Sequence, residues 1–165
     1  MTEKKAQGRP STLFDLLAGR AGEQGDARAY TFLLDGETAE AHLTYAELDR
    51  QARAIGAALQ ALSAKGERVL LLYPPGLDYV AAFFGCLYAG AVAVPAYPPR
   101  SNRPSARLAA IQASSGAKVV LTVAAVLAGL DRQLQREEGV EWLATDGALL
   151  AGAEAGFREP GVRAD

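Results

Sequence analysis

The sequence has very few of the residues that build disulfides and metal sites. Cys86 is the only cysteine in 165 residues, so no disulfide can form within the chain, as is typical of a reducing compartment. His42 is the only histidine, so no pair of histidines can hold a metal ion. A catalytic thiol needs a base and a partly exposed, electropositive setting, whereas Cys86 lies in the apolar run 83–88. We therefore interpret Cys86 and His42 as structural residues.

Long charged runs and long uninterrupted apolar runs are also missing. No run of like charge exceeds two residues, and the formal net charge is −2, which gives no attraction to nucleic acid. The first eleven residues contain no apolar segment after their lysines, so they do not form a secretory signal. The most apolar region, 79–97, is interrupted by glycines and a proline, which argues against a transmembrane segment. We expect a soluble, cytoplasmic protein.

A glycine-rich phosphate loop is the third absence. Neither the G-x-G-x-x-G pattern nor G-x-x-x-x-G-K-[ST] occurs. Gly85 and Gly90 have the spacing of the second pattern, but Ala91 and Val92 replace its Lys and Ser/Thr. We interpret the two glycines as a helix-packing residue and a helix stop.

What the sequence does contain is a regular alternation of helical and strand patterns, in a composition that is half hydrophobic. A short helix is predicted over 12–21, and strands over 29–34 and 41–45 are joined by a polar linker, which favours a β-hairpin. Thr44 and Glu47 have the spacing of a capping box, and the amphipathic helix that follows runs to Leu62. Such a length suits one domain with a real core.

From residue 69 onward the pattern is strand, helix, strand, helix. Apolar runs at 69–73, 91–96, 118–122 and 140–145 predict buried strands of a parallel sheet. The intervening helices are predicted over 77–88, 105–114 and 123–138, the last one capped by Thr122. The prediction is an α/β fold, with a mainly parallel sheet, helices on both faces and an N-terminal β-hairpin. We expect a flexible tail at 1–10, one α/β unit over 11–146, and a linker or unpartnered segment at 147–165.

Two proline-rich segments are the candidate binding residues. Both follow predicted buried strands, so they are expected at the same edge of the sheet, where ligands of open α/β sheets gather. Rigid prolines and a tyrosine there can wall a pocket for an apolar or planar ligand, although prolines also simply end strands. The candidate substrate-binding residues are Tyr73, Pro74, Pro75, Gly76, Pro95, Tyr97 and Pro98.

Charged side chains form two further clusters. Arg100, Arg103 and Arg107 are spaced three and four apart, so on a helix they form one basic face for an acidic partner or a phosphate. A solvated surface is the simpler interpretation, because exposed charges contribute little energy. The second cluster, interpreted as the solvated face of a helix, consists of Asp131, Arg132, Arg136, Glu137 and Glu138.

Several longer strings make the chain resemble a known family. The strings are STLFDLL, YTFLL, LTYAELDRQARAIGAALQ, ERVLLLYPPGLDYVAAFFGCLYAGAVAVPAYPPR, KVVLT and WLATD, in this order over about residues 11–146. In these the chain resembles the N-terminal portion of a fatty acyl-AMP ligase, a member of the adenylate-forming superfamily. YPPG and CLYAG…VPAYPP are the specific strings, and they favour acyl-AMP ligases over acyl-CoA ligases. The resemblance implies the N-terminal subdomain of the adenylate-forming fold.

The resemblance also implies an activity for the full-length enzyme. Such an enzyme activates a fatty acid with ATP and Mg²⁺, giving acyl-adenylate and pyrophosphate. The acyl group then passes to the phosphopantetheine arm of an acyl carrier protein, often at the head of a polyketide or lipopeptide assembly line. Activation is needed because a carboxylate is a poor acyl donor until AMP becomes its leaving group.

The chain departs from the family in lacking the parts that carry the chemistry. The family's phosphate loop, adenine site, metal-holding glutamate and catalytic lysine have no matching positions here, so no catalytic, cofactor-binding or metal-binding residue is assigned. Lys65 and Lys118 lie in no matching motif. We expect the 165 residues alone to be inactive. The alternatives are a non-catalytic module that binds a lipid or a carrier protein, and the N-terminal part of a fatty acyl-CoA ligase. An exposed sheet edge would favour self-association.

Overall fold

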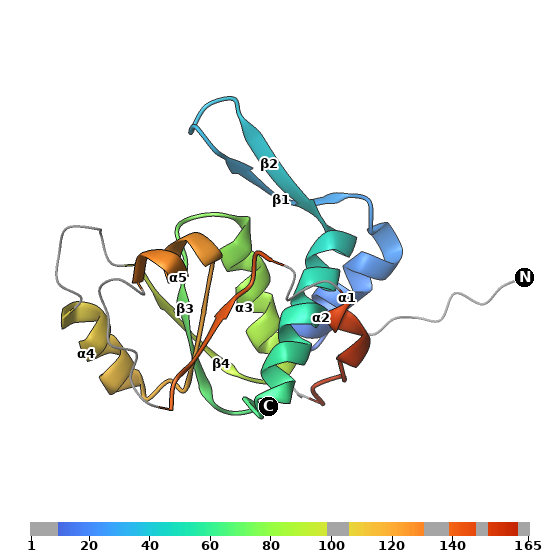
Figure 1. The fold of residues 1–165 in the computed structure, drawn as a ribbon. Coiled ribbons are helices and arrows are strands. Elements are labelled where there is room, and N and C mark those ends of the chain that lie inside the picture. The colour runs from blue at the N-terminus through green and yellow to red at the C-terminus, as the bar shows by residue number, and fades with distance from the viewer. Residues whose placement is uncertain (1–9, 99–105, 131–138, 148–151, 162–165) are drawn as a thin grey trace, which may run out of the picture.

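The N-terminal part of the chain forms a helix and a projecting hairpin in the computed structural model, which describes residues 10–98, 106–130, 139–147 and 152–161. Helix α1 (Leu13–Gln24) begins with a capping box between Thr12 and Asp15. Strands β1 (Arg28–Leu33) and β2 (Glu40–Thr44) pair antiparallel, as predicted. Their hairpin extends beyond the body of the molecule (Figure 1).

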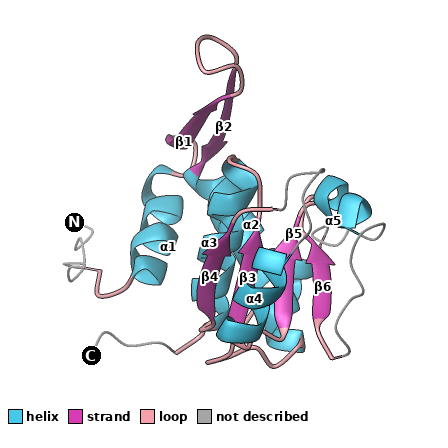
Figure 2. Cartoon of the chain, turned by 90° about the vertical axis from the view of Figure 1, so that its left-hand side faces the viewer, coloured by secondary structure: helices cyan, strands magenta, loops and turns pink. Residues whose placement is uncertain are grey.

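The second half of the chain builds a parallel sheet of four strands. The strands are β3 (Arg68–Leu72), β4 (Val92–Ala96), β5 (Val119–Thr122) and β6 (Glu141–Ala144), in the order β4-β3-β5-β6. Every neighbouring pair is parallel, so all carboxyl ends lie at one edge of the sheet (Figure 2). The predicted α/β class with a parallel sheet is confirmed.

Helices cover both faces of this sheet. Val69 and Leu71 pack in one cluster with α2 (Tyr45–Ala61) and α3 (Leu77–Ala89). Leu70 and Leu72 point the other way and pack with Leu108 of α4 (Ala106–Ser115). This alternation explains why β3 is apolar at every position from 69 to 72: each residue is covered by a helix layer on its own side. None of the helices within the described residues is long and apolar enough to cross a lipid bilayer.

Helix α2 begins as the sequence predicts. The Thr44 hydroxyl accepts a hydrogen bond from the backbone N–H of Glu47, and the Glu47 carboxylate accepts one from the backbone N–H of Thr44 at 2.8 Å. The two side chains thereby satisfy free amides at the positive end of the helix.

The predicted cap of helix α5 (Ala124–Leu130) is wrong. Thr122 is fully buried, and its hydroxyl donates to the carbonyl of Leu72 at 2.7 Å, so it joins neighbouring strands instead of capping the helix. The first helical amide, that of Ala124, donates instead to the carboxylate of Asp146 at 2.8 Å. The cap comes from 22 residues further along the chain, where local pattern gives no signal. The predicted continuation of α5 to residue 138, with the acidic and basic cluster from Asp131 to Glu138, lies outside the described residues.

The segment after β6 packs on the outer side of α2. It contains a short 3-10 helix, η2 (Ala153–Gly156), followed by Phe157, whose ring lies 5.5 Å from that of Tyr88. The side chain of Gln60 donates to the carbonyl of Arg158 at 2.7 Å and accepts from its backbone N–H at 3.1 Å. Residues 152–161, interpreted from sequence as a linker or an unpartnered segment, therefore contact α2 within this chain, and we call them the strap.

Candidate functional site

The carboxyl edge of the sheet is where the chain changes direction. It leaves β3 toward β4 at one side of the sheet and then returns past β3 to form β5. In open α/β sheets, ligands bind beside the carboxyl ends of the strands at such a switch point. The two proline-rich segments lie at this edge, because the first follows β3 and the second spans the end of β4.

The structure brings most of the predicted site residues around one pocket of about 300 Å³. Gly76 and Pro98, which were also predicted, are not among its lining residues. Pro95 lies opposite Leu71 in the parallel register, on a strand at the side of the described sheet, where a residue without an N–H is tolerated. The pocket, hereafter the apolar pocket, is lined by Tyr73, Pro74, Pro75, Tyr79, Pro95, Ala96 and Tyr97.

A buried network of hydroxyl groups holds the base of this pocket. The Tyr73 hydroxyl lies 2.7 Å from the Thr145 hydroxyl, which is itself buried at the end of β6. Thr122 lies on β5, between β3 and β6, and its hydroxyl donates a hydrogen bond to the carbonyl of Leu72. Burial raises the pKa of Tyr73 well above its usual range, so the phenol stays neutral. The network joins the ends of three strands and fixes the start of the proline segment.

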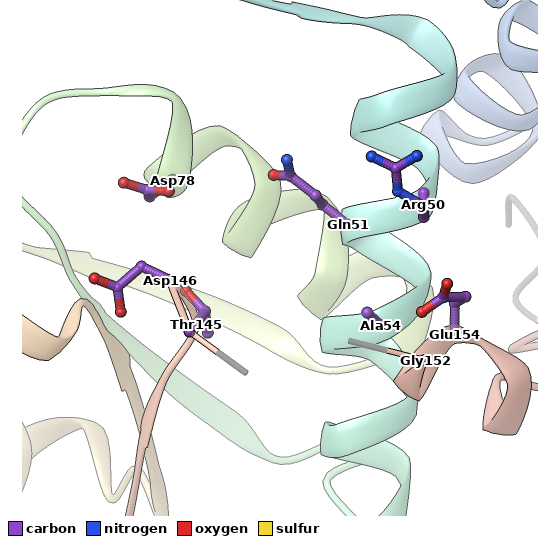
Figure 3. Close-up of a pocket in the computed structure, with 9 residues that line it drawn as sticks. Arg50, Gln51, Ala54, Asp78, Thr145, Asp146, Gly152 and Glu154 are labelled. Carbon is purple, nitrogen blue, oxygen red and sulfur yellow. The ribbon is translucent and has the colours of Figure 1, made fainter. Parts of the chain in front are cut away.

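A second pocket of about 390 Å³ adjoins the same edge and is polar (Figure 3). It is lined by Arg50 and Gln51 of α2, by Asp78 at the start of α3, and by residues that follow β6 or belong to the strap. Among the latter are Thr145, Asp146 and Glu154. Thr145 lines this polar pocket and also bonds Tyr73, which lines the apolar pocket, so the Tyr73–Thr145 hydrogen bond links the two.

One carboxylate in the polar pocket, that of Asp78, has a shifted pKa. The pKa of Asp78 is raised, first by partial burial and second by the nearby charge of Asp146. Asp146 is engaged in capping α5 through the amide of Ala124. Across the part of the chain that the structure describes, no three acidic, histidine or cysteine side chains gather as metal ligands would.

The other sequence candidates lie elsewhere. Cys86 is buried and burial raises its pKa to about 12, so at neutral pH it is a protonated packing residue, as interpreted from the sequence. His42 is exposed on the hairpin.

The basic side chains considered in the sequence also lie away from the two pockets or outside the described residues. Lys118 pairs with Glu67 at 3.3 Å near the amino ends of β5 and β3, and Lys65 donates to the carbonyl of Pro160. Arg107 is exposed, while Arg100 and Arg103 lie outside the described residues.

Sequence reasoning missed several residues at this edge. Tyr79 and Ala96 line the apolar pocket, and Thr145 and Asp146 line the polar one. A signal existed for three of them, because Ala96 ends a predicted strand, Thr145 ends the last predicted strand, and Asp146 follows it directly. Tyr79 lies in the helix predicted over 77–88, two residues after the start of α3, and nothing in the sequence pattern indicated that its side chain lines a pocket.

A comparison with models of protein families shows which family the chain belongs to. Residues 17–161 match the AMP-binding enzyme family. The chain belongs to this family. Among curated relatives, the medium-chain-fatty-acid–[acyl-carrier-protein] ligase JamA of Moorena producens (strain JHB) is 51% identical over 115 residues, which are 68% of this chain and 19% of JamA. The long-chain-fatty-acid–AMP ligase FadD32 of Mycolicibacterium smegmatis is 36% identical over 110 residues, covering 65% of this chain and 18% of the relative.

Solved structures of AMP-binding enzymes share the fold. The fatty acyl-adenylate ligase from L. pneumophila, in complex with acyl adenylate and pyrophosphate, superposes with a TM-score of 0.82 and 32% identity, over 94% of this chain and 26% of that chain. The nonribosomal peptide synthetase FmoA3 with α-methyl-L-serine-AMP gives a TM-score of 0.72 at 28% identity, over 93% of this chain and 16% of that chain. The resemblance to fatty acyl-AMP ligases is thus confirmed. The chain spans about a fifth of the length of the two curated relatives above.

Proposed function

We propose that this chain is the N-terminal portion of an ATP-dependent fatty acid ligase. In the whole protein, a carboxylate oxygen of the fatty acid attacks the α-phosphorus of ATP, and pyrophosphate leaves with Mg²⁺ bound. A phosphopantetheine thiol of an acyl carrier protein then attacks the acyl carbonyl, and AMP leaves. The observation that carries the proposal is the 51% identity with JamA, a ligase of medium-chain fatty acids and an acyl carrier protein. We expect the whole protein to act in the cytoplasm.

Within that enzyme, the chain supplies framework and one wall of the substrate route. The segments 73–76 and 95–98 line or adjoin the apolar pocket at the carboxyl edge, and we assign them to the path of the acyl chain or the pantetheine arm. No catalytic residue is assigned. The sequence has no glycine-rich phosphate loop and the described residues form no metal-ligand cluster, so the triphosphate and Mg²⁺ are assigned to other parts of the protein.

A chimera tests the proposal. The segment of JamA that matches this chain is replaced by the corresponding residues of the chain, and ATP–pyrophosphate exchange is measured with medium-chain fatty acids. We expect exchange that depends on fatty acid and lies within about tenfold of that of JamA, because the AMP-binding framework is shared. A folded chimera without exchange would contradict the proposal. Exchange also separates the ligase from the alternative of a non-catalytic lipid- or carrier-binding module.

The acceptor of the acyl group distinguishes the remaining alternative. The whole protein that contains this chain is loaded with a fatty acid and ATP and offered either CoA or a phosphopantetheinylated carrier protein. Transfer to the carrier protein alone supports an acyl-AMP ligase, and transfer to CoA supports the acyl-CoA ligase alternative. FadD21 of Mycobacterium tuberculosis (strain ATCC 25618 / H37Rv), described as a putative fatty-acid–CoA ligase, is 33% identical over 129 residues, which makes this comparison necessary.

Self-association of the isolated chain is part of the same proposal. Within the described residues, the outer sides of β4 and β6 pair with no further strand, and open strand edges favour pairing between chains. Size-exclusion chromatography that shows only a monomer at every concentration would contradict this point.

A further inference from the structure

We propose that a pocket between α1 and the base of the hairpin is a docking site for a partner protein that presents an acidic amphipathic helix. The partner inserts one aliphatic or aromatic side chain into the pocket and places a carboxylate beside Arg20. None of the described lining residues of this pocket lines either pocket at the carboxyl edge of the sheet. The inference therefore goes beyond the proposed ligase activity and does not depend on it.

Four elements converge on this pocket, hereafter the α1 pocket. Its floor consists of Leu17, Leu48 and Phe84, which are buried core residues of α1, α2 and α3. The fourth element is β1, whose start lies beside α1 at the base of the hairpin (Figure 2). The lining falls within residues 16–84, a stretch that the structure describes without a gap. The core of the chain thus holds the pocket in shape.

A β-bulge directs two successive side chains of β1 into the α1 pocket. Successive residues of a strand ordinarily point to opposite faces, yet Ala29 and Tyr30 both line the pocket. The cause is the register shift between Arg28 and Tyr30 in the pairing of β1 with β2. Bulges of this kind re-aim side chains. Because Tyr30 is still 42% exposed, its ring lies where the pocket meets solvent.

The charge of the α1 pocket selects an acidic partner. Arg20 is the one charged residue among the described lining residues, and it is exposed. The three ion pairs of the described residues involve other cations, so Arg20 is unpaired in that part of the chain. The other polar side-chain groups of the lining are the hydroxyls of Tyr30 and Tyr45, which can donate hydrogen bonds. A carboxylate beside the inserted side chain therefore finds a cation and two donors, whereas an ammonium group is repelled.

The surface around the α1 pocket favours a helix over a small ligand. The pocket volume of about 210 Å³ is below the range of about 300–1,000 Å³ that is typical of small-molecule sites. Leu13 and Leu16 lie one turn apart on α1 and are 48% and 40% exposed, so the apolar surface continues along the helix beyond the pocket. Apolar surface of this kind marks protein interaction sites, where arginine and tyrosine are common anchors. An amphipathic helix can cover both leucines while one of its side chains fills the pocket.

Binding of two designed peptides tests the inference. The first probe is a labelled helix of about twenty residues with leucines along one face and glutamates on the others, and the second has lysine in place of every glutamate. Each is titrated into the 165-residue chain, and binding is followed by fluorescence anisotropy and by the NMR amide shifts of residues 13–20 and 29–30. We expect the glutamate probe to bind saturably with a Kd at least about tenfold below that of the lysine probe. Nonspecific attraction would favour the lysine probe instead, because the net charge of the chain is −2.

Charge reversal connects the binding to the α1 pocket without altering the core. Arg20→Glu should raise the Kd of the glutamate probe by about five- to tenfold and lower that of the lysine probe, since the charge beside the pocket is inverted. Arg107→Glu makes the same change at an exposed position of α4 and should leave both values as they were. Ala29→Leu fills the pocket and should weaken the glutamate probe by at least about tenfold, the equivalent of losing two or more buried methylenes.

Several outcomes would overturn the inference. Unmoved amide shifts around the pocket, or equal effects of Arg20→Glu and Arg107→Glu, would show that the probe binds elsewhere or only by general charge. Binding to the chain that is absent from the whole protein containing it would mean that another part of that protein fills the pocket. Displacement of the probe by decanoate would assign the pocket to a small anionic amphiphile, and a dimer that Arg20→Glu dissociates would assign it to a second copy. None of these measurements involves ATP, so they are independent of the tests of ligase activity.

Discussion

At the scale of single residues, the side chain of Asp35 holds the turn of the hairpin together. Its carboxylate accepts hydrogen bonds from the backbone N–H groups of Glu37, Thr38 and Ala39, each at 2.9 Å. These bonds favour the charged carboxylate and lower its pKa from 3.8 to about 2, with the amide of Glu37 the largest cause. The stabilisation is therefore fully present above pH 3.8 and is lost as the pH falls through about 2.

We predict that the amide chemical shifts of residues 37–39 titrate with a midpoint near pH 2, as the carboxylate that they donate to becomes protonated. An NMR titration of the folded chain measures this midpoint. In Asp35→Ala the same amides should show no transition in this range. A midpoint near the ordinary value of 3.8 would show that the three hydrogen bonds do not hold the carboxylate.

Cys86 illustrates how burial determines reactivity. Because burial raises its pKa to about 12, almost no thiolate exists at pH 8, and reagent access is blocked as well. We predict that Ellman's reagent does not react with the native chain at pH 8 and reacts with one thiol per chain in denaturant. Rapid reaction under native conditions would contradict the packing role and reopen the possibility of a nucleophile.

At the scale of elements, the contact between α2 and α3 depends on a glycine. A Cβ added to Gly85 would clash with the Cγ2 of Ile55 and lie 2.6 Å from its Cβ. Gly22 in α1 has no atom within 4 Å of the same position, so it is a matched control. The two sites separate helix–helix packing from helix propensity.

We predict opposite effects of alanine at these two sites on the free energy of unfolding, measured by urea denaturation. Gly85→Ala should destabilise by about 1–3 kcal/mol, because the helices must move apart or distort. Gly22→Ala should stabilise by about 0.5–1 kcal/mol, because alanine loses less backbone entropy in a helix. A neutral or stabilising Gly85→Ala would show that α2 and α3 do not pack as closely as described.

The strap is a second element-level contact. Phe157 packs near Phe14 and Tyr88, and the guanidinium of Arg53 lies 5.1 Å from the centre of its ring. Arg158, next along the chain, bonds Gln60 of α2 through its backbone N–H and carbonyl groups, and its side chain is exposed.

We predict that Phe157→Ala lowers the free energy of unfolding by about 2 kcal/mol, less than for a fully buried phenylalanine because Phe157 is partly exposed. Arg158→Ala should change it by less than about 0.5 kcal/mol, as surface substitutions usually do. Equal stability of the two variants would mean that the strap does not hold α2.

Whether a contact of this fold could be predicted from the sequence depends on how far apart its two residues lie along the chain. The helices and strands, the Thr44 capping box and the parallel sheet follow from patterns within about fifteen residues. Except for the end of α5, which lies outside the described residues, their bounds were predicted to within a few residues. The Asp146 cap of α5, the Tyr73–Thr145 bond and the strap on α2 join residues 22 to 98 positions apart. Local pattern carries no information about such contacts. The prediction that Thr122 caps α5 was wrong for the same reason, because its buried hydroxyl donates to the carbonyl of Leu72, a residue 50 positions away.

At the scale of the whole molecule, most of the residues predicted for the site lie together because parallel strands share one edge. Tyr73 and Pro95 are 22 positions apart, yet both line the apolar pocket, as expected from their places after and at the ends of neighbouring strands. That these residues bind substrate stays a proposal. The chain belongs to the AMP-binding enzyme family, and our proposal is that it serves the acyl side of the reaction while other parts of the protein hold the triphosphate.

Calorimetric titration of MgATP into the 165-residue chain tests this division most directly. We predict no saturable heat up to millimolar nucleotide, because the sequence lacks a glycine-rich phosphate loop and the described residues form no metal-ligand cluster. One-to-one binding with a micromolar Kd would contradict it, because the chain would then hold the nucleotide by itself.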